Sequence, residues 1–591
     1  MPRGDAGRLS KRFGFEDPVC ITYTGGFPPG SLVMVRMTGG EALVRSLVME
    51  GVDVVFGLPG IQLYGIVAAL RDEPAIRKIT TRHEQATTYM ADGYARATGK
   101  PGVALVVPGA GLYNAAAGLA TAYARCSQVL IIAGQIPRDQ IGKNLEGVHE
   151  IADQSSVVRP VTKWRTLVLT PQDIPSAVNE AFRQMRTGCP RPVMIEIPPD
   201  VGVEREEVVL QQPASLSAVV PSGKRLQEAA RAIARSSLPL IYAGGGVARA
   251  DAEGALVKLA EATNIPVITS CGGKGTIPDS HPLSYGSCVS PRGERHEMNQ
   301  LYEVMQSADL VIGVGTRFSL GNPAGESSTL ININIDEREL TRLQSNTIPL
   351  PGDARMTIEA LLPLLDEAGA GDRPSPAEAV IAARRLIVHY DIQDREPQYP
   401  ILQLIRDTIP DDAFVVWGIT QFGYYARTHF QVNQPKTYID SGYSFNLGYA
   451  FPTALGVKVG QPDRPVVCII GDGGFMFNSS ELSTAMKYGI NLTTVVFRND
   501  SFGNVARDLD EFFDGTYETD LHNPDFVEFA ESFGAVGLRA EDPSDLSMLI
   551  PLAREHPAPV IIDVPVKNMP LPRAKALQHI PSLAWSVPER A

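Results

Sequence analysis

Short apolar runs alternate with longer, mixed stretches along the chain from Met37 onward. Runs such as 103–107 and 129–133 are apolar throughout, which is typical of strands buried on both faces of a parallel sheet. Further strands are predicted at 53–56, 192–198, 238–246, 266–269, 310–317, 331–336, 413–417, 465–470, 492–497 and 559–563. The stretch 84–98 predicts a helix, and Gly99 directly after it is a common helix stop. The repeated strand–helix alternation predicts an α/β protein whose parallel sheets are doubly wound, with helices on both faces.

The alternation falls into three blocks, separated by polar stretches rich in proline or glycine at 211–223 and 368–376. We therefore predict three doubly wound parallel-sheet domains. The predicted units are a loose N-terminal extension (1–34), a first domain (35–205), a central domain (224–365), a third domain (395–568) and a C-terminal tail (569–591). The extension is rich in glycine and proline and lacks the apolar core of a signal peptide, so we interpret it as a loose segment or a start-site artefact.

Composition and charge exclude several classes of function. The 591 residues carry a net charge of −13, so we expect no nucleic-acid partner and no attraction to anionic lipid. No apolar run reaches the about 18 residues that a membrane span needs. The six cysteines form no CxxC pair, which argues against structural disulfides or a zinc site and fits a reducing cytoplasm. We interpret most of these thiols as small core residues.

Candidate chemistry is concentrated in residues 471–500. The apolar run 465–470 leads directly into a Gly-Asp-Gly-Gly turn, and glycines there let backbone amides approach a phosphate closely. The Asn-Ser-Ser-Glu stretch at 478–481 resembles a capping box that opens a helix ending at Gly489. The positive N-terminus of that helix would face the phosphates.

A second strand end supplies matching oxygen ligands. The apolar run 492–497 is followed by Asn499, and we expect this strand to lie beside the strand that leads to Asp472. One carboxylate and one amide oxygen, with the backbone carbonyl of Ser501 as a third ligand, suit Mg²⁺ that bridges to diphosphate oxygens. The glycine turn alone would equally suit an ordinary α/β turn with a helix cap, but Asn499 at matched spacing favours the metal site.

These motifs resemble those of thiamine-diphosphate-dependent enzymes, in which Gly-Asp-Gly is followed by paired asparagines. Arg498 stands where the first asparagine is common, whereas the second, ligand-bearing one is retained as Asn499. A second marker of the family, a glutamate in an Arg-His-Glu-Gln stretch, is matched by Glu84. The resemblance implies that Glu84 is catalytic: it would hydrogen-bond N1′ of the aminopyrimidine and promote loss of the thiazolium C2 proton. Without that context Glu84 would be an ordinary surface residue of a helix.

Within this family the chain is similar to the acetolactate synthase large subunit from Met37 to about Val566, in the order pyrimidine-binding, central and diphosphate-binding domain. Leu447 falls where the family has a bulky apolar residue that bends the cofactor, although ordinary core packing is the alternative. The carbonyl of Phe445 would accept from the 4′-amino group. The cofactor-binding residues so implied are Glu84, Gly471, Asp472, Gly473, Gly474, Phe445, Leu447, Asn499 and Ser501, with Asp472, Asn499 and Ser501 as the metal ligands.

The segments expected to shape the substrate pocket depart from the synthases. Their Phe-Gln pair is missing from 141–150, where His149 is either a structural hydrogen-bonder or a proton shuttle. Their Met and Trp are matched by Asn504 and Asp508, and such polar groups do not grip an alkyl chain. The candidate pocket residues are Gly57, Pro59, Gln135, His149, Asn504 and Asp508.

Two further implications concern a flavin and the assembly. The turns at 244–246 and 315–317, with Asp336, lie where the synthases hold FAD, but relatives without flavin keep similar turns, so FAD stays open. In such enzymes the pyrimidine and diphosphate sites of one cofactor belong to different subunits. The resemblance therefore implies a homodimer or homotetramer, and it leaves open whether a regulatory subunit exists.

The function so implied is that of a thiamine-diphosphate- and Mg²⁺-dependent transferase or lyase. It would act on a small 2-oxo acid by ylid addition and decarboxylation, with carboligation to a second carbonyl. The alternatives are a simple 2-oxo acid decarboxylase and a lyase or hydrolase that cleaves a carbon–carbon bond without decarboxylation. A catalytically silent homologue is a third, against which the intact Glu84, Asp472 and Asn499 argue.

Overall fold

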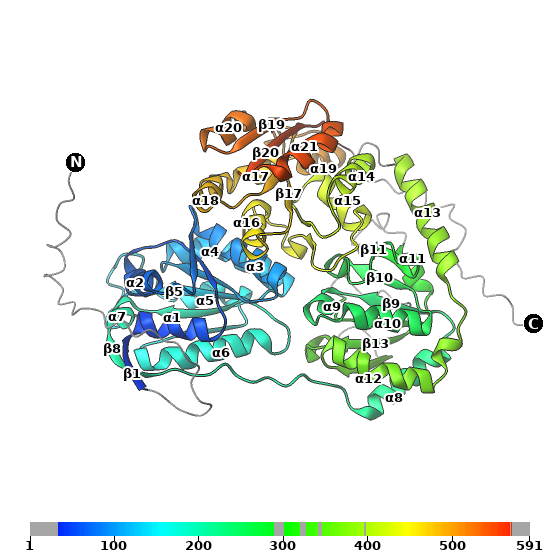
Figure 1. Ribbon diagram of the computed structural model, residues 1–591, viewed down its shortest axis with the longest axis horizontal. Helices are drawn as coiled ribbons and strands as arrows, with labels where there is room; N and C mark the ends of the chain where they lie inside the picture. Colours follow the sequence, from blue (N-terminus) through cyan, green and yellow to red (C-terminus); the bar gives the residue numbers. More distant parts are fainter. Residues whose placement is uncertain are drawn as a thin grey trace, which may run out of the picture.

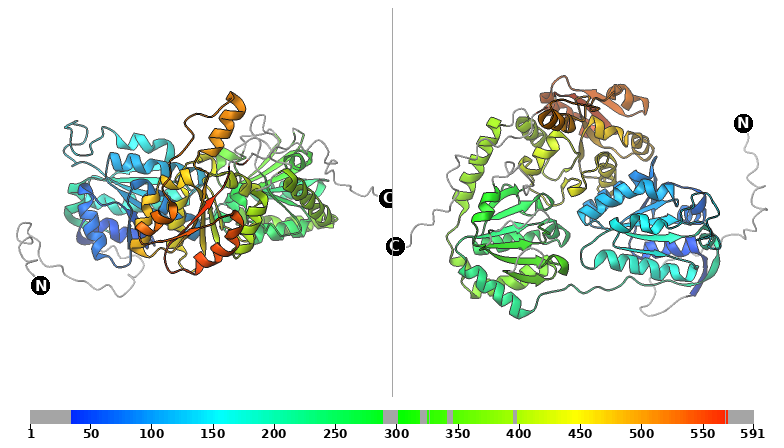
Figure 2. Two further views of the ribbon diagram at one scale, coloured as in Figure 1. Left: turned by 90° about the horizontal axis from the view of Figure 1, so that it is seen from above. Right: turned by 180° about the vertical axis from the view of Figure 1, so that it is seen from behind.

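The three predicted α/β units are present and lie at the corners of a triangle (Figure 1). The same arrangement is visible from behind (Figure 2). The structure, a computed structural model, describes residues 34–288, 301–318, 325, 327–340, 346–394, 398–567 and 569. The predicted extension and tail therefore lie outside the described residues, apart from Met34 and Met569. None of the helices in these ranges is long and apolar enough to cross a membrane.

The first domain has eight strands and seven α-helices among its described residues. The strands are β1 (Met34–Thr38), β2 (Val54–Gly57), β3 (Arg77–Thr80), β4 (Gly102–Val106), β5 (Val129–Gly134), β6 (Trp164–Leu167), β7 (Val193–Ile197) and β8 (Arg205–Val209). The helices are α1 (Gly39–Met49), α2 (Tyr64–Asp72), α3 (Glu84–Thr98), α4 (Ala110–Arg125), α5 (Gln154–Val158), α6 (Ile174–Arg186) and α7 (Pro199–Val203). Six strands form a parallel sheet in the order β3-β2-β4-β5-β7-β6. The other two, β1 and β8, form a small antiparallel pair that the sequence pattern did not predict.

The central domain is joined to the first by residues 210–222, which have no regular secondary structure. Its strands are β9 (Pro239–Ala243), β10 (Val267–Ser270), β11 (Ser284–Cys288), β12 (Leu310–Val314), β13 (Thr329–Asn334) and β14 (Thr347–Pro351). Its helices are α8 (Gly223–Arg235), α9 (Gly245–Arg249), α10 (Glu253–Thr263), α11 (Leu301–Ser307) and α12 (Ala354–Glu367). The sheet order is β11-β10-β9-β12-β13-β14, again all parallel. An additional helix, α13 (Ala377–Asp394), leads to the third domain.

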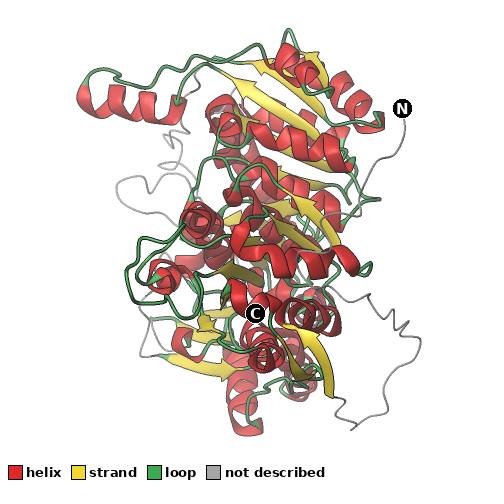
Figure 3. Ribbon diagram, turned by 90° about the vertical axis from the view of Figure 1, so that its left-hand side faces the viewer, coloured by secondary structure: helices red, strands yellow, loops and turns green. Residues whose placement is uncertain are grey.

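The third domain has a parallel sheet in which the strand that ends at the glycine turn is central. Its strands are β15 (Phe414–Trp417), β16 (Tyr438–Ile439), β17 (Val466–Gly471), β18 (Thr493–Arg498), β19 (Val536–Arg539) and β20 (Val560–Pro565). Its helices are α14 (Gln398–Thr408), α15 (Gln421–His429), α16 (Ala450–Gly460), α17 (Asp472–Met476), α18 (Leu482–Tyr488), α19 (Gly503–Phe513), α20 (Phe526–Ser532) and α21 (Leu546–Glu555). The order is β16-β15-β17-β18-β20-β19. Helices flank the sheets throughout (Figure 3), which confirms the predicted fold class.

The strands that the apolar runs predicted are the inner strands of the three sheets, and those that they missed are the edge strands. The missed strands of the sheets are β3, β6, β11, β14, β16 and β19. An edge strand has a partner on one side only and stays partly open to water, so it needs no continuous apolar run. In β6, for example, all four residues are only half-buried, whereas every residue of the inner strand β5 is buried.

The first and third domains share one core, in which α3 packs closely against α16 (Figure 1). Glycines permit this approach: a Cβ on Gly93 of α3 would collide with the carbonyl oxygen of Thr453, and one on Gly456 of α16 would collide with that of Met90. Apolar residues of both helices and of both sheets belong to the same buried cluster. The two sheets are therefore held in one body by a contact of backbone against backbone.

Replacing Gly456 with alanine is expected to destabilise the protein, because the added methyl group meets a backbone atom that cannot rotate away. We expect the free energy of unfolding to fall by about 1–3 kcal/mol, although alanine by itself favours a helix by up to about 1 kcal/mol. Urea denaturation measures the change. The matched control is Gly254→Ala in α10, where a Cβ meets no atom within 4 Å and stability should hold or rise. Equal losses in the two variants would contradict this account.

Candidate functional site

The glycine turn and the asparagine turn lie side by side, because β17 and β18 are hydrogen-bonded neighbours. Gly471 at the end of β17 pairs in register with Phe497 of β18. The carboxyl ends of adjacent parallel strands therefore present Asp472 and Asn499 at the same edge of the sheet. This confirms the neighbour relation that the sequence predicted for the two strands.

Asp472 is a buried carboxylate that is surrounded by hydrogen-bond donors. Its Oδ2 accepts from the backbone N–H of Asp500 at 2.7 Å, from that of Asn499 at 3.2 Å and from the side-chain amide of Asn523 at 2.9 Å. Burial raises the pKa of Asp472, while its hydrogen bonds with the backbone lower it. No basic side chain among the described residues forms an ion pair with it. A buried carboxylate without a cationic partner is costly, so a divalent cation fits this position.

The turn that follows β18 leaves one carbonyl available. Asp500 has a left-handed backbone with a φ of 52°, and its carbonyl accepts from the N–H of Leu521 at 2.8 Å. The carbonyl of Phe502 accepts from Val505 and Ala506. Between them, the carbonyl of Ser501 has no hydrogen-bond donor among the residues that the structure describes. Carboxylate, amide and carbonyl oxygens are together a hard donor set of the kind that Mg²⁺ takes.

A cavity of about 240 Å³ opens beside these groups. It is lined by Gly471, Asp472, Gly473, Gly474, Phe445, Leu447, Asn499, Ser501 and Asn504, together with apolar and aromatic residues of the same domain. Leu447 is half-buried and faces this cavity, so it is not an ordinary core residue. Phe445 has a φ of 49°, stacks on Tyr424 at 6.1 Å between ring centres, and lies 4.4 Å from the guanidinium of Arg427. The structure thus gathers in one cavity nearly all of the residues implied for the cofactor.

Arg498, which departs from the paired-asparagine pattern, takes part in a network of ion pairs. Its guanidinium donates to the buried Asp563 of β20 at 2.9 and 3.2 Å and to Asp500 at 3.4 Å. Asp500 in turn accepts from Asn523, the residue that also donates to Asp472. Arg498 therefore links the turn that follows β18 to the adjacent strand β20. Asn523 belongs to the site but was not predicted, because no sequence spacing links it to the glycine turn.

The predicted capping box at 478–481 is wrong. Asn478 caps no backbone N–H with its side chain, and instead donates to the carbonyl of Gly448 at 2.8 Å. Glu481 reaches into the first domain, where its carboxylate accepts from the backbone N–H groups of Arg82 and His83, each at 3.0 Å. The short helix α17, rather than α18, begins at the glycine turn. Capping boxes bond within one helix end, whereas here tertiary contacts claim both side chains.

Glu481 thereby holds the loop that leads directly to Glu84. We expect Glu481→Ala to lower the free energy of unfolding by about 1–3 kcal/mol, because two partly buried N–H groups lose their acceptor. The amides of Arg82 and His83 should also exchange their hydrogens faster, which mass spectrometry of local peptides detects. The control is Glu528→Ala on the exposed side of α20, which should change neither quantity. Unchanged exchange at 82 and 83 in Glu481→Ala would refute the clamp.

Glu84 is the first residue of α3 and accepts from the side-chain amide of Asn114 on α4 at 3.0 Å. It is half-buried. The cavity beside Asp472 is lined only by residues of the third domain, from Ile419 to Val566, so one chain by itself does not bring Glu84 to that cavity. Glu84 lies instead at the carboxyl edge of the first sheet, just after β3.

Of the other predicted pocket residues, some follow strands of the first sheet and some lie in the third domain. Gly57 ends β2 and Pro59 follows it, while Gln135 follows β5 and donates to the buried Glu196 at 2.9 Å. His149 is exposed and has a φ of 65°. In the third domain Asn504 lines the cavity and Asp508, one turn further along α19, does not. Arg507 bonds to both of these side chains, each at 3.0 Å.

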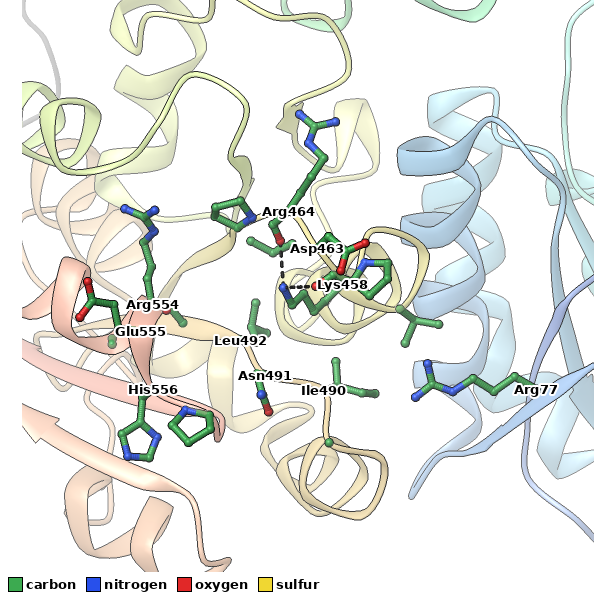
Figure 4. Close-up of a pocket in the computed structure, with 18 residues that line it drawn as sticks. Arg77, Lys458, Asp463, Arg464, Ile490, Asn491, Leu492, Arg554, Glu555 and His556 are labelled. Atoms are coloured by element: carbon green, nitrogen blue, oxygen red, sulfur yellow. Dashed lines mark hydrogen bonds between the residues drawn. The ribbon is translucent and has the colours of Figure 1, made fainter.

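A larger cavity, of about 420 Å³, lies at the opposite edge of the third sheet (Figure 4). It contains none of the predicted site residues. The ammonium of Lys458 is held there by the carbonyls of Pro462 at 2.8 Å and Arg464 at 2.9 Å, and the guanidinium groups of Arg464 and Arg554 point away from the cavity (Figure 4). Size alone therefore does not mark the functional site, and the converging oxygen atoms of the smaller cavity do.

The glycine turns of the central domain have a packing role. A Cβ on Gly246 would lie within 3 Å of backbone atoms of Gly315, and one on Gly244 would collide with the carbonyl of the same residue. Asp336 is buried and paired with Arg338 at 2.8 Å, which lowers its pKa. The turns that raised the question of FAD are thus needed to bring two strand ends together.

The site joins a buried carboxylate, an amide and a carbonyl, to which no described residue donates, with a glycine turn at a strand end. Comparison with known proteins agrees with it: the sequence matches the thiamine pyrophosphate enzyme N-terminal TPP binding domain over 37–157, the central domain over 226–361 and the C-terminal TPP binding domain over 418–564. The chain therefore belongs to the thiamine pyrophosphate enzymes.

Relatives within this family carry more than one activity in their names. A probable 2-ketoarginine decarboxylase of Pseudomonas aeruginosa is 34% identical over 86% of this chain and 90% of its own length. A probable acetolactate synthase large subunit of Methanocaldococcus jannaschii is 32% identical over 90% of this chain and 93% of its own. The large subunit of acetolactate synthase isozyme 3 of Escherichia coli is 32% identical over 88% and 93%.

Proposed function

We propose that this protein binds thiamine diphosphate with Mg²⁺ in the cavity beside Asp472 and decarboxylates a 2-oxo acid. The observation that carries the proposal is the buried carboxylate of Asp472, which has no cationic partner among the described residues and lies beside Asn499. Asp472, Asn499 and the carbonyl of Ser501 would hold the metal. The glycine turn would receive the diphosphate, and Leu447 and Phe445 would support the rings of the cofactor.

When bound, thiamine diphosphate supplies an electron sink for cleavage of the bond between the carboxyl and carbonyl carbons. The chain itself would orient the cofactor, exclude water with Leu447, Phe445 and Phe502, and exchange a proton with the aminopyrimidine through Glu84. Asn114 holds the Glu84 carboxylate in one orientation. We do not include a flavin, because the glycines at its expected place have a packing reason of their own.

Because Glu84 and Asp472 lie at the edges of different sheets, we propose that each site is completed by a second copy of the chain in a homodimer or homotetramer. The support is that only third-domain residues line the Asp472 cavity. Exposed apolar side chains near both edges, among them Tyr64, Val148 and Phe477, would be covered in such an assembly.

The proposed activity includes carboligation, in which the fragment left after loss of CO₂ would be joined to a second carbonyl, as the names of the acetolactate synthase relatives suggest. Simple decarboxylation is the second candidate, favoured by the name of the Pseudomonas relative and by the polar Asn504, which lines the cavity and is tied to Arg507. A panel of pyruvate, 2-oxobutyrate and 2-ketoarginine, scored for CO₂ and for acyloin products, separates the two. Cleavage of a diketone without CO₂ would instead indicate the lyase or hydrolase alternative.

Replacement of Asp472 by asparagine should remove the metal site while keeping the size of the side chain. The asparagine carbonyl can still accept the N–H bonds that reach Oδ2, but the charge and the bond that Oδ1 accepts from the N–H of Gly473 are lost. Loss of a residue that only hydrogen-bonds to a metal ligand typically weakens metal binding by about 10–100-fold. Because Asp472 would be a ligand itself, we expect Mg²⁺-dependent binding of thiamine diphosphate to weaken by at least that factor. Calorimetric titration measures it, with Asp510→Asn on exposed α19 as the control. Equal affinities in the wild type and Asp472→Asn would refute the metal assignment.

Replacement of Glu84 by glutamine should abolish turnover and leave cofactor binding largely intact. The amide keeps the size of the side chain but cannot exchange a proton, so the rate should fall by about 10²–10⁴-fold. Consumption of the best 2-oxo acid and calorimetry with thiamine diphosphate are measured on the same preparation. The control is Glu207→Gln on β8, an exposed position of the same domain. Wild-type rates in Glu84→Gln would overturn the catalytic role.

A further inference from the structure

Two cysteines that are far apart in the sequence meet inside the first domain. Cys126 follows the last residue of α4, and Cys189 lies between α6 and β7. Their sulfur atoms are 3.2 Å apart, with the thiol of Cys189 donating to the sulfur of Cys126. Both side chains are buried. A disulfide bond is about 2.0 Å long, so a displacement of about 1 Å separates this pair from a covalent one.

The surroundings of the pair are strongly basic on one side. Arg191 donates to the carbonyl of Tyr123. Two arginines of the central domain bond to the next two carbonyls of α4: Arg317 donates to that of Ala124, and Arg249 donates to that of Arg125. These guanidinium groups thus gather at the C-terminal end of α4, directly before Cys126. The hydrogen bond from Cys189, aided by the three arginines, lowers the pKa of the Cys126 thiol well below its usual range despite its burial.

The two sulfurs are unequal as a result. The pKa of Cys189 is raised, first because its thiol donates to Cys126 and then because it is buried. A thiol that donates a hydrogen bond to a neighbouring sulfur favours loss of the proton from that neighbour, which is the arrangement of an attacking and a resolving cysteine. Cys468, by contrast, is buried in β17 and burial alone raises its pKa, so it serves as an inert comparison.

We propose that Cys126 and Cys189 are an oxidisable dithiol site that a peroxide converts to an intrachain disulfide. The Cys126 thiolate attacks one oxygen of hydrogen peroxide; the O–O bond breaks, and the leaving hydroxide takes a proton to become water. The Cys189 sulfur then attacks the sulfur of the sulfenic acid on Cys126, the S–O bond breaks, and this hydroxide leaves as water with the proton of Cys189. In sum two thiols are oxidised to one disulfide and one peroxide is reduced to two waters. Because both sulfurs are buried, only a small oxidant such as hydrogen peroxide would reach them.

The disulfide would join the C-terminal end of α4 to the segment that enters β7. Near its N-terminal end the same helix carries Asn114, the hydrogen-bond partner of Glu84. The disulfide would close a span of 63 residues and so reduce the freedom of the unfolded chain. The oxidised protein should therefore unfold at a temperature higher by at least about 2 °C.

The test uses the full chain, reduced and then exposed to increasing hydrogen peroxide. Digestion without reductant should yield a cross-linked peptide pair containing 126 and 189, which separates on addition of dithiothreitol, and the melting temperature should rise. Cys271→Ser is the control and should cross-link like the wild type, whereas Cys189→Ser should not. Cys189→Ser should instead retain a sulfenic acid at Cys126 that dimedone captures.

The wild-type measurement decides the proposal without depending on how any variant folds. Overoxidation of either cysteine to sulfinic acid in place of the 126–189 cross-link would overturn it, as would a cross-link through Cys271. An absence of reaction at peroxide concentrations that oxidise exposed methionines would also overturn it. Dimedone capture at Cys189 in a Cys126→Ser variant would reverse the assigned roles and contradict the proposal as stated.

Discussion

The backbone contact between α3 and α16 is the constraint on which the site depends. Gly93 and Gly456 allow the helices to approach until carbonyl groups of one lie over the glycines of the other. The first and third sheets thereby share one core, and Glu481 can reach the loop before α3. Each sheet then presents its carboxyl edge, with Glu84 at one edge and Asp472 at the other, in a fixed relation. The site that we propose to be completed by a second copy would need that relation to be rigid, because misplacement by even 1 Å is costly in catalysis.

In the third domain a carboxylate, that of Asp472, stays buried although no described basic side chain pairs with it. Backbone amides and the amide of Asn523 orient Asp472, and Arg498 braces the same turn through Asp500. Arg498 is held in turn by the buried Asp563 of the adjacent strand. The charges of Arg498, Asp500 and Asp563 are thus paired with one another. The carboxylate of Asp472 has no basic partner among the described residues, and a cation would be bound there. This division explains why an arginine is tolerated in the place of the first asparagine.

The fold was predictable where burial is complete and unpredictable where it is partial. Inner strands such as β4 and β5 are apolar throughout, so their pattern alone identifies them, whereas the edge strands β6 and β19 carry no such run. The site divides in the same way. Asp472 and Asn499 follow inner strands directly and could be found from spacing, but the bonds of Asn523 and Glu481 depend on segments brought together by folding. A local motif therefore suggested a capping box that the tertiary structure does not contain.

By itself the sequence determined the α/β class, the inner strands and the family with its cofactor, because each rests on motifs whose own residues are close together in the chain, even where the motifs themselves lie far apart. Only the tertiary structure decided that Leu447 faces a cavity, that Glu84 lies at a different edge from Asp472, and that Cys126 meets Cys189. Those relations join distant segments, and the packing of helices on sheets sets the distances between them. Spacing along a strand is dictated by local geometry, whereas proximity across a core is decided only when the whole chain has folded.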